Sequence, residues 1–236
     1  MIMQGHFKKL SSESLIYGLG GAAGALTGLF LTPVLTRIFV PADYGVIELI
    51  TTTTAILLVI ITLGIDTAYG IEFFHAEDEF GRKTLVATSM ILTTSIAILL
   101  TVVLYFSASS ISQILFKTTQ YRSVLQLSFF SLPLTVTMSF ILQTLRFHFK
   151  AWAYTIINLT KVPLVISTTI FFVSQLHRGI QGVFQASLAA TIIICAVALW
   201  MYRPYFSRYY SGQAARQLLR LGLPLIPAGI AGWTLS

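Results

Sequence analysis

The chain has 236 residues, of which 56% are hydrophobic and only 10% are charged. An average soluble domain is roughly 45–50% apolar and about 25% charged, so this composition excludes a secreted scaffold and a cytosolic enzyme. The formal net charge is +7, but the Lys and Arg residues are scattered between apolar runs, which favours anchoring at a membrane over nucleic-acid binding. The single cysteine, Cys195, excludes a disulfide or a Cys-based metal site within the chain.

Six runs of about 20 apolar residues predict six transmembrane helices. They lie near residues 15–36, 45–68, 84–106, 124–145, 151–174 and 182–201. A seventh run opens at Leu221, but the chain stops at Ser236, which is too early for a complete span. We therefore expect an all-α integral membrane protein whose seventh helix is incomplete.

The positions of Lys and Arg predict the orientation, because basic residues favour the cytoplasmic side in short loops. With a cytoplasmic N-terminus, ten of them lie in inside segments and four in outside loops. This orientation predicts a cytoplasmic loop over residues 72–83 and a loop on the outside over residues 107–120. A signal peptide cleaved after Ala23-Gly24-Ala25 is the weaker interpretation, because the apolar run continues past that stretch.

The first span carries Gly20, Gly24 and Gly28 at four-residue spacing. Such a row of small residues allows another helix to approach closely, and it is also compatible with a helix that bends during a transport cycle. The spacing alone does not separate these interpretations.

Four charged residues lie at the ends of the first two spans. Asp43 is expected to cap the second helix, and Asp66 is expected to lie at the membrane interface where that span ends. Arg37 either extends its side chain outward or faces a watery interior. Glu48 is a buried carboxylate candidate that pairs with Arg37 or takes up a proton, and pairing is the favoured interpretation.

Lys161 is the most informative residue, since it stands about ten residues into the fifth span and so near the bilayer midplane. A charged side chain at this depth costs at least ~2.5–3.5 kcal/mol on insertion scales and usually faces a bundle interior or a water-filled cavity. Asn158 and Pro163 predict a kinked polar patch around it. Lys161 is therefore interpreted as part of an anion site, with structural pairing to Glu48 as the alternative.

Motifs of enzymes are weak in this chain. It has no nucleophile elbow, phosphate-binding P-loop or zinc-binding His pair at usable spacing, so we expect neither catalysis nor a cofactor. His75 with Asp78 or Glu79 has helical spacing, but one His and two acids in a solvated loop are common, and no metal site is expected. The residues favour a carrier for an anionic or amphiphilic solute.

Four stretches of the chain match a known family pattern. They are Leu35-Thr36-Arg37 with Pro41-Ala42-Asp43-Tyr44-Gly45, Leu63-Gly64-Ile65-Asp66-Thr67-Ala68, Arg178-Gly179-Ile180-Gln181-Gly182-Val183 and Gly222-Leu223-Pro224-Leu225-Ile226-Pro227. Together they resemble the bacterial polysaccharide-biosynthesis flippases of the O-antigen flippase (Wzx) type. The superfamily of these flippases also holds the multidrug and toxin extruders. The resemblance covers the whole chain, and the Pro-x-Asp-Tyr-Gly stretch is its most specific part.

The resemblance implies a transporter of two six-helix lobes, with the present chain as the N-terminal half. Residues 1–14 are then a cytoplasmic N-terminal segment, 15–202 the first lobe, 203–220 a cytoplasmic basic linker and 221–236 the start of the second lobe. It also implies alternating access around a cationic cavity that exports an undecaprenyl-diphosphate-linked oligosaccharide across the bacterial inner membrane. The substrate-binding residues assigned on this basis are Arg37, Lys161 and, more weakly, Arg146, while Glu48 and Asp66 are assigned to coupling or ion pairing.

The expected partners are the lipid-linked oligosaccharide, membrane lipids and the polymerase and glycosyltransferases of surface-polysaccharide synthesis, with no nucleic acid. One alternative is a multidrug or other lipid-precursor exporter. Another is a membrane partner of a glycan-synthesis complex that does not itself transport. Acidic residues in the lumen would be expected for export of cationic drugs, and Lys161 favours an anionic headgroup instead.

Overall fold

The computed structural model describes residues 16–62, 64–205 and 209–225. Six helices in these ranges are long and apolar enough to cross a membrane, so the predicted all-α membrane fold with six spans is confirmed. They are Ile16–Leu35, Pro41–Thr62, Glu79–Phe116, Arg122–Phe147, Ala151–Gln175 and Gly179–Tyr202. The chain forms two compact units, a first of residues 1–40 and 142–194 and a second of residues 41–141 and 195–236.

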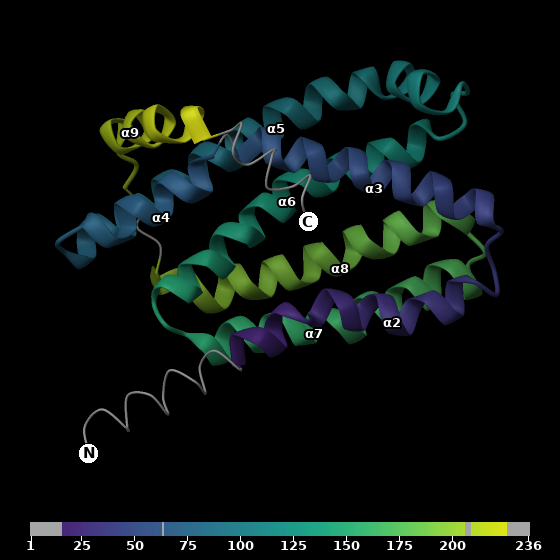
Figure 1. Ribbon diagram of the computed structural model, residues 1–236, viewed down its shortest axis with the longest axis horizontal. Coiled ribbons are helices and arrows are strands. Elements are labelled where there is room, and N and C mark those ends of the chain that lie inside the picture. The colour runs from purple at the N-terminus through teal and green to yellow at the C-terminus, as the bar shows by residue number, and fades with distance from the viewer. Residues whose placement is uncertain (1–15, 63, 206–208, 226–236) are drawn as a thin grey trace. The chain divides into compact units, whose positions relative to one another are not determined.

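The first unit is built on the packing of the first span against α7 (Ala151–Ile170), and the two helices lie side by side (Figure 1). The span ends in α2 (Ala23–Leu35). Gly20 is the contact point, because a Cβ there would lie 2.9 Å from Cε1 of Tyr154 and 3.0 Å from Oγ1 of Thr155. The Thr155 hydroxyl also donates to the carbonyl of Ile16 over 2.7 Å. Close packing is thus confirmed at Gly20.

The glycine row does not continue as predicted. Among the described atoms, none lies within 4 Å of a Cβ built on Gly24 or Gly28, and both residues are exposed. Beyond Gly20 the close-packing interpretation has no counterpart among the described residues, and the bending interpretation stays a prediction. Each step of four residues turns the side-chain direction by about 40°, and α7 packs along α2 as well, so Gly24 and Gly28 point away from α7.

A tight turn joins α7 to α8 (Gly179–Tyr202) through the π-helical turn η1 (Phe171–Gln175). Gly179 has a φ of 55°, in the left-handed region where glycine is favoured. A Cβ on Gly182 would lie 3.0 Å from the carbonyl oxygen of Phe172, so a glycine also suits the next turn. Backbone geometry thus accounts for both glycines of the 178–183 stretch.

The second unit contains a long hairpin of α5 (Glu79–Phe116) and most of α6 (Arg122–Phe147). Its two helices share polar contacts, with 3.0 Å between the hydroxyls of Thr94 and Thr137. The hydroxyl of Thr101 donates to the carbonyl of Phe129 over 3.1 Å. With 38 residues, α5 is about 57 Å long at 1.5 Å per residue, so it extends beyond a hydrocarbon core of about 30 Å.

Both loops predicted next to α5 are wrong in extent. The helix continues to Phe116, so only residues 117–121 connect it to α6 instead of 107–120. At its other end, α4 (Ile65–His75) and α5 leave only residues 76–78 between them, within the expected loop 72–83. Asp78 starts α5, because its carboxylate accepts a hydrogen bond from the Gly81 amide over 2.9 Å. The mixed charges after it lie on the helix, where Lys83 and Glu79 pair over 2.8 Å.

The second predicted span is interrupted. The helix α3 (Pro41–Thr62) begins at Pro41, so Asp43 lies within its first turn and does not precede it as a cap. Gly64 has a φ of 67° and separates α3 from α4, so the predicted continuous span over 45–68 is wrong. Asp66 lies in the first turn of α4, where a carboxylate interacts favourably with the helix dipole.

A further helix, α9 (Gly212–Gly222), packs on α4 and α5 through Ala215, Leu218 and Gly222. The Ser211 hydroxyl caps it by accepting from the amide of Ala214 over 3.2 Å. A Cβ on Gly64 would collide with the carbonyl oxygen of Gly222. The break between α3 and α4 is therefore in direct backbone contact with the end of α9. Residues 226–236, most of the expected seventh span, lie outside the described part of the chain.

The contact at Gly20 predicts the effect of enlarging that residue. Gly20→Val would insert a branched side chain between the first span and α7, and we expect it to destabilise the protein by about 1–3 kcal/mol. Gly24→Val is the matched control, since that position has open space around it. The thermal unfolding midpoint in detergent measures both. Equal midpoints for the two variants would contradict the Gly20 contact.

The break at Gly64 predicts a second destabilising substitution. Gly64→Ala would hold an L-residue in the left-handed region, at a cost of about 1–2 kcal/mol, and would also push against Gly222. Gly45→Ala, within α3 and without a close neighbour among the described atoms, is expected to leave stability unchanged or raise it. The rate of limited proteolysis within α9 gives a second measurement, because a protease would cleave a displaced α9 faster. Unchanged stability and cleavage in Gly64→Ala would contradict the role of this contact.

Candidate functional site

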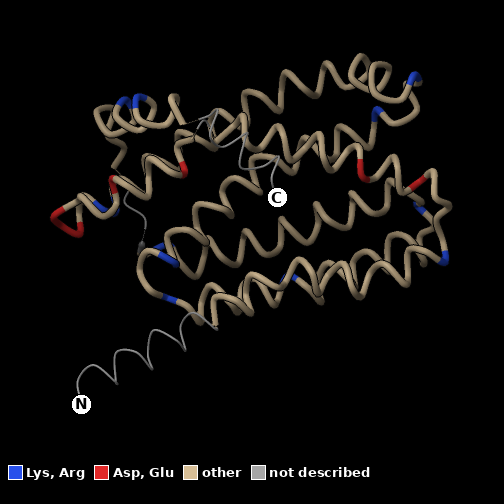
Figure 2. The backbone as a smooth tube through the Cα atoms, viewed as in Figure 1, with Lys and Arg blue, Asp and Glu red and all other residues tan. Residues whose placement is uncertain are grey.

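Charge is unevenly divided between the two units. Every described Asp and Glu belongs to the second unit, whereas residues 16–40 and 142–194 of the first unit contain none. The Lys and Arg residues of those ranges are Arg37, Arg146, Lys150, Lys161 and Arg178. Figure 2 accordingly shows no red along α2, α7 and the part of α8 in this unit, and blue within α7. All three residues predicted to bind substrate lie in these acid-free ranges of the first unit.

Lys161 lies on the polar side of α7. The helix exposes an apolar stripe formed by Trp152, Ile156, Leu159 and Ile170. At 3.6 residues per turn, Lys161 is about 180° around the helix from this stripe. Its side chain is exposed, and it shares its face with Tyr154 and Asn158. If the stripe faces lipid, as its composition favours, Lys161 points away from the lipid.

The neighbours of Lys161 on this face are polar but uncharged. The side-chain amide of Asn158 donates to the carbonyl of Tyr154 over 2.9 Å. Further along α7, the hydroxyl of Thr168 lies 3.3 Å from the carbonyl of Ala186 on α8. The predicted pairing of Lys161 with Glu48 has no counterpart inside the first unit, since the described part of that unit holds no acid.

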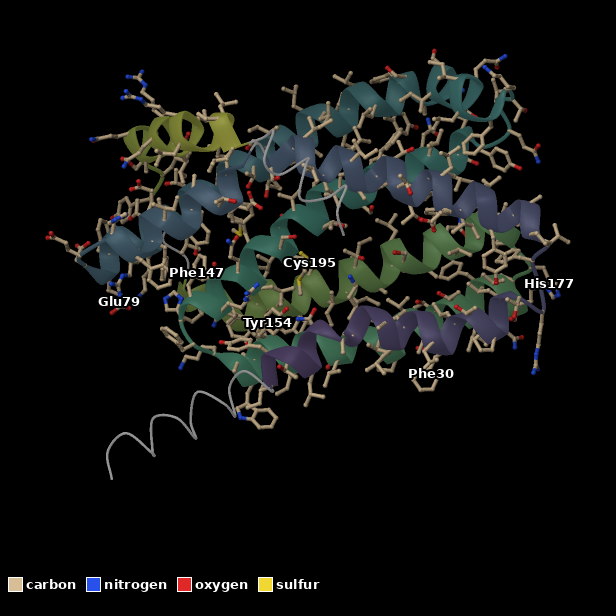
Figure 3. The ribbon with its side chains drawn as sticks, in the orientation of Figure 1. Phe30, Glu79, Phe147, Tyr154, His177 and Cys195 are labelled. Atoms are coloured by element: carbon tan, nitrogen blue, oxygen red, sulfur yellow. The ribbon has the colours of Figure 1, made fainter. Side chains whose placement is uncertain are left out.

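Arg146 lies near the end of α6, over an aromatic pair. Its guanidinium carbon is 6.0 Å from the centroid of the Tyr154 ring, which is within the range of a cation–π interaction. The Tyr154 ring meets that of Tyr17 edge to face, with 5.4 Å between centroids. Tyr154 lies toward one end of the unit and His177 at the other (Figure 3). Arg146 is exposed, so its remaining N–H donors are accessible.

The three predicted cations lie at three levels of the first unit. The first span and α7 start at the same end, where Gly20 meets Tyr154 and Arg146 sits over the ring. Lys161 follows seven residues after Tyr154, about 10 Å along the helix. Arg37 follows 17 residues after Gly20, about 25 Å along, in an exposed turn beyond α2. The cations therefore form a series along the length of the unit.

The two predicted coupling residues lie in the second unit. Glu48 is exposed on α3, and its Oε1 atom lies 3.4 Å from the hydroxyl of Thr52. Asp66 is half-buried on α4. Neither belongs to the unit that holds Arg37, Arg146 and Lys161, so their coupling and pairing roles stay predictions.

Two features were not singled out from the sequence. Oε1 of Gln185 on α8 is buried and accepts no hydrogen bond from the described residues. Arg216 and Arg220 line a groove beside α4 that depends on the position of α9. In the described ranges no three His, Cys, Asp or Glu residues come together as a metal site would require. A lone amide in an apolar run and two arginines of a basic linker carry no specific sequence signal.

Comparisons with known proteins identify the family and the fold. A family model described as polysaccharide biosynthesis protein matches residues 10–233. No curated protein matches the chain at a significant level. Among solved structures, an outward-facing multidrug resistance MATE family transporter of the MOP superfamily is 17% identical, with a TM-score of 0.77. The match covers 92% of this chain and 51% of that transporter.

A second solved structure is an MOP superfamily transporter from Pyrococcus furiosus, described as having a binding pocket of reverse polarity. It is 18% identical with a TM-score of 0.73, over 92% of this chain and 51% of that one. At such identities the likeness establishes the fold, which is that of one MATE-like transporter lobe. The chain spans about half the length of the solved structures that it matches.

Proposed function

Since the chain belongs to the polysaccharide biosynthesis protein family, we propose that it forms the N-terminal lobe of a flippase for a lipid-linked oligosaccharide. The substrate would be an undecaprenyl-diphosphate-linked glycan that crosses the bacterial inner membrane for surface-polysaccharide synthesis. The observation that carries this proposal is the series of cations in the first unit, whose residues 16–40 and 142–194 contain no acid. A diphosphate is anionic, and a fixed cation attracts it more strongly in a partly desolvated cavity than in bulk water.

Lys161 is the central residue of the proposed path. A lysine facing lipid near mid-depth would cost at least ~2.5–3.5 kcal/mol, and its position opposite the apolar stripe of α7 avoids that cost. An aqueous cavity on the polar side of α7 would keep the ammonium hydrated until the headgroup arrives. Asn158 on the same face supplies an amide to the same environment.

The spacing of the cations suits stepwise movement. Arg146, held over the Tyr154 ring, would meet the headgroup at one mouth, Lys161 midway and Arg37 at the other mouth. Arg binds phosphate oxygens with two parallel N–H donors, whereas Lys acts as a compact point charge that releases its ligand readily. Alternating access would pass the headgroup between these levels, with Glu48 or Asp66 serving a coupling cation.

The complete transporter in this proposal has two lobes, because the solved transporters are about twice as long as the matched region. Residues 15–202 form the first lobe, 203–220 a cytoplasmic linker and 221–236 the start of the second lobe. The proposed partners are the polymerase and glycosyltransferases that use or supply the same glycan.

A multidrug exporter is the second candidate function, since a multidrug resistance transporter shares the fold. Cationic drugs require acidic groups in the binding cavity, and the described residues of the first unit contain none. This difference favours an anionic substrate.

Substitutions at Lys161 in the full-length protein test the substrate site. We expect Lys161→Ala to reduce glycan export more than tenfold at normal protein level, because the midway cation is lost, and Lys161→Arg to retain a substantial part of it. Arg122→Ala, at the start of α6 in the second unit, is the charge-matched control and should export normally. Surface glycan in a flippase-deficient strain and an immunoblot of the protein give the two readouts.

The opposing result would come from a variant that removes both charges of the alternative ion pair between Lys161 and Glu48. If Lys161→Met with Glu48→Gln restored export lost in Lys161→Ala, a neutral cavity would move the anion equally well. Lys161 would then be a structural partner of Glu48, and the substrate-site assignment would be wrong.

The proposed cytoplasmic N-terminus predicts a labelling pattern. In a Cys195→Ser background, an impermeant maleimide added to spheroplasts should label Thr119→Cys, because residues 117–121 would lie on the periplasmic side. It should leave Glu77→Cys unlabelled until the membrane is opened. Both positions are exposed in short connections, so they serve as controls for each other. The reversed pattern would overturn the orientation.

A further inference from the structure

A groove runs along the outward side of α9 and reaches Glu72 of α4, in the second unit. It has a volume of about 540 Å³, within the range of about 300–1,000 Å³ typical of small-ligand pockets. Its lining residues are Glu72 on α4 and, from α9, Gln213, Arg216, Gln217, Arg220 and Leu221. This groove takes no part in the proposed export path.

The sequence of α9 explains why the arginines face the groove. Ala215 and Leu218 are buried against α4 and α5, which turns the opposite side of the helix outward. Arg216 and Arg220 are four residues apart and so project from one face. Both are exposed, and neither forms an ion pair with an acidic residue of the described ranges. The Lys and Arg positions of α9 are blue in Figure 2.

The residues flanking α9 are those of a membrane interface. Tyr209 and Tyr210 precede the helix with 65% and 51% of their surfaces exposed, and Leu223 follows it with 50% exposed. Tyrosine is enriched where a membrane meets water, and basic residues on a short amphipathic helix attract anionic lipids. Because only residues 203–211 separate α9 from the end of the membrane-crossing helix α8, its groove is expected at the level of lipid headgroups.

We propose that this groove binds the headgroup of a singly anionic glycerophospholipid, of the phosphatidylglycerol type. Two arginines and one glutamate give the groove a net charge of +1, which matches a phosphodiester charge of −1. The arginines can donate to the phosphate oxygens as charge-assisted pairs. The Glu72 carboxylate and the amides of Gln213 and Gln217 can accept from the glycerol hydroxyls. A choline headgroup has no such donors, and both choline and ethanolamine lipids are neutral overall.

A bound headgroup would connect α9 to α4 through the arginines and Glu72. The end of α9 is also where Gly222 contacts Gly64 at the break between α3 and α4. Lipid binding would therefore stabilise the packing of α9 on α4, by a free energy that grows with the logarithm of the ratio of lipid concentration to dissociation constant.

Native mass spectrometry of the purified chain in detergent, titrated with phosphatidylglycerol or phosphatidylcholine, tests this site. We expect bound phosphatidylglycerol at concentrations where phosphatidylcholine does not bind. Arg216→Gln and Arg220→Gln should each weaken phosphatidylglycerol binding about fivefold, as expected for one cation at an anionic lipid. Arg203→Gln is the matched control, since Arg203 is exposed, lies between α8 and α9 and does not line the groove.

A second variant keeps the test valid should the arginine substitutions impair folding. Leu221→Glu adds a carboxylate to the groove at an exposed position and should also weaken phosphatidylglycerol binding. An equal loss in Arg203→Gln would overturn the site, because it would indicate attraction to the overall positive charge. Equal binding of phosphatidylcholine would overturn it as well. So would displacement of the lipid by inorganic phosphate at the same concentration, since the groove would then bind phosphate irrespective of a lipid.

Discussion

The cost of placing an ammonium in hydrocarbon is the constraint on which the first unit depends. Lys161 is near the middle of a membrane-crossing helix, and the described part of its unit contains no acid that could neutralise it. Within this unit, only water or an anionic ligand would compensate the charge, and the apolar stripe of α7 is turned to the other side. This requirement explains why α7 has its apolar stripe on one side and its lysine on the other, in a unit whose described charged residues are all basic.

Close backbone contacts at glycines hold the charged helices in place. Hydrocarbon supplies little driving force between helices, so association depends on packing and on hydrogen bonds between them. Gly20 lets Tyr154 and Thr155 approach the first span, and the same tyrosine ring then lies under Arg146. A single small residue thus helps to set the position of α7, of its lysine and of the arginine in the last turn of α6. In the second unit, Gly64 gives the end of α9 the same kind of access.

The sequence was sufficient for the number and kind of membrane-crossing helices, because hydrocarbon thickness imposes a length that apolar runs reveal directly. Details at helix ends were not predictable from hydropathy. Gly64 breaks a run that stays apolar, and α5 continues through polar residues up to Phe116. Lys161 was found because an ionisable residue in an apolar run is rare. Its face on α7 and the cation–π contact of Arg146 required the packing of separate helices.

The charged residues of the two units suit two different proposed functions, anion transport in the first unit and lipid binding in the second. In the proposed export path, no described acid of the same unit competes for Arg37, Arg146 or Lys161, which would leave them available to a passing anion. In the second unit, Glu72 stands beside Arg216 and Arg220 without forming an ion pair, and this mixture suits a headgroup that has hydroxyls as well as one negative charge. A transported headgroup must leave its site, which favours cations spaced along a path. A lipid that stabilises the packing of α9 on α4 must stay, which favours donors and acceptors gathered around one groove.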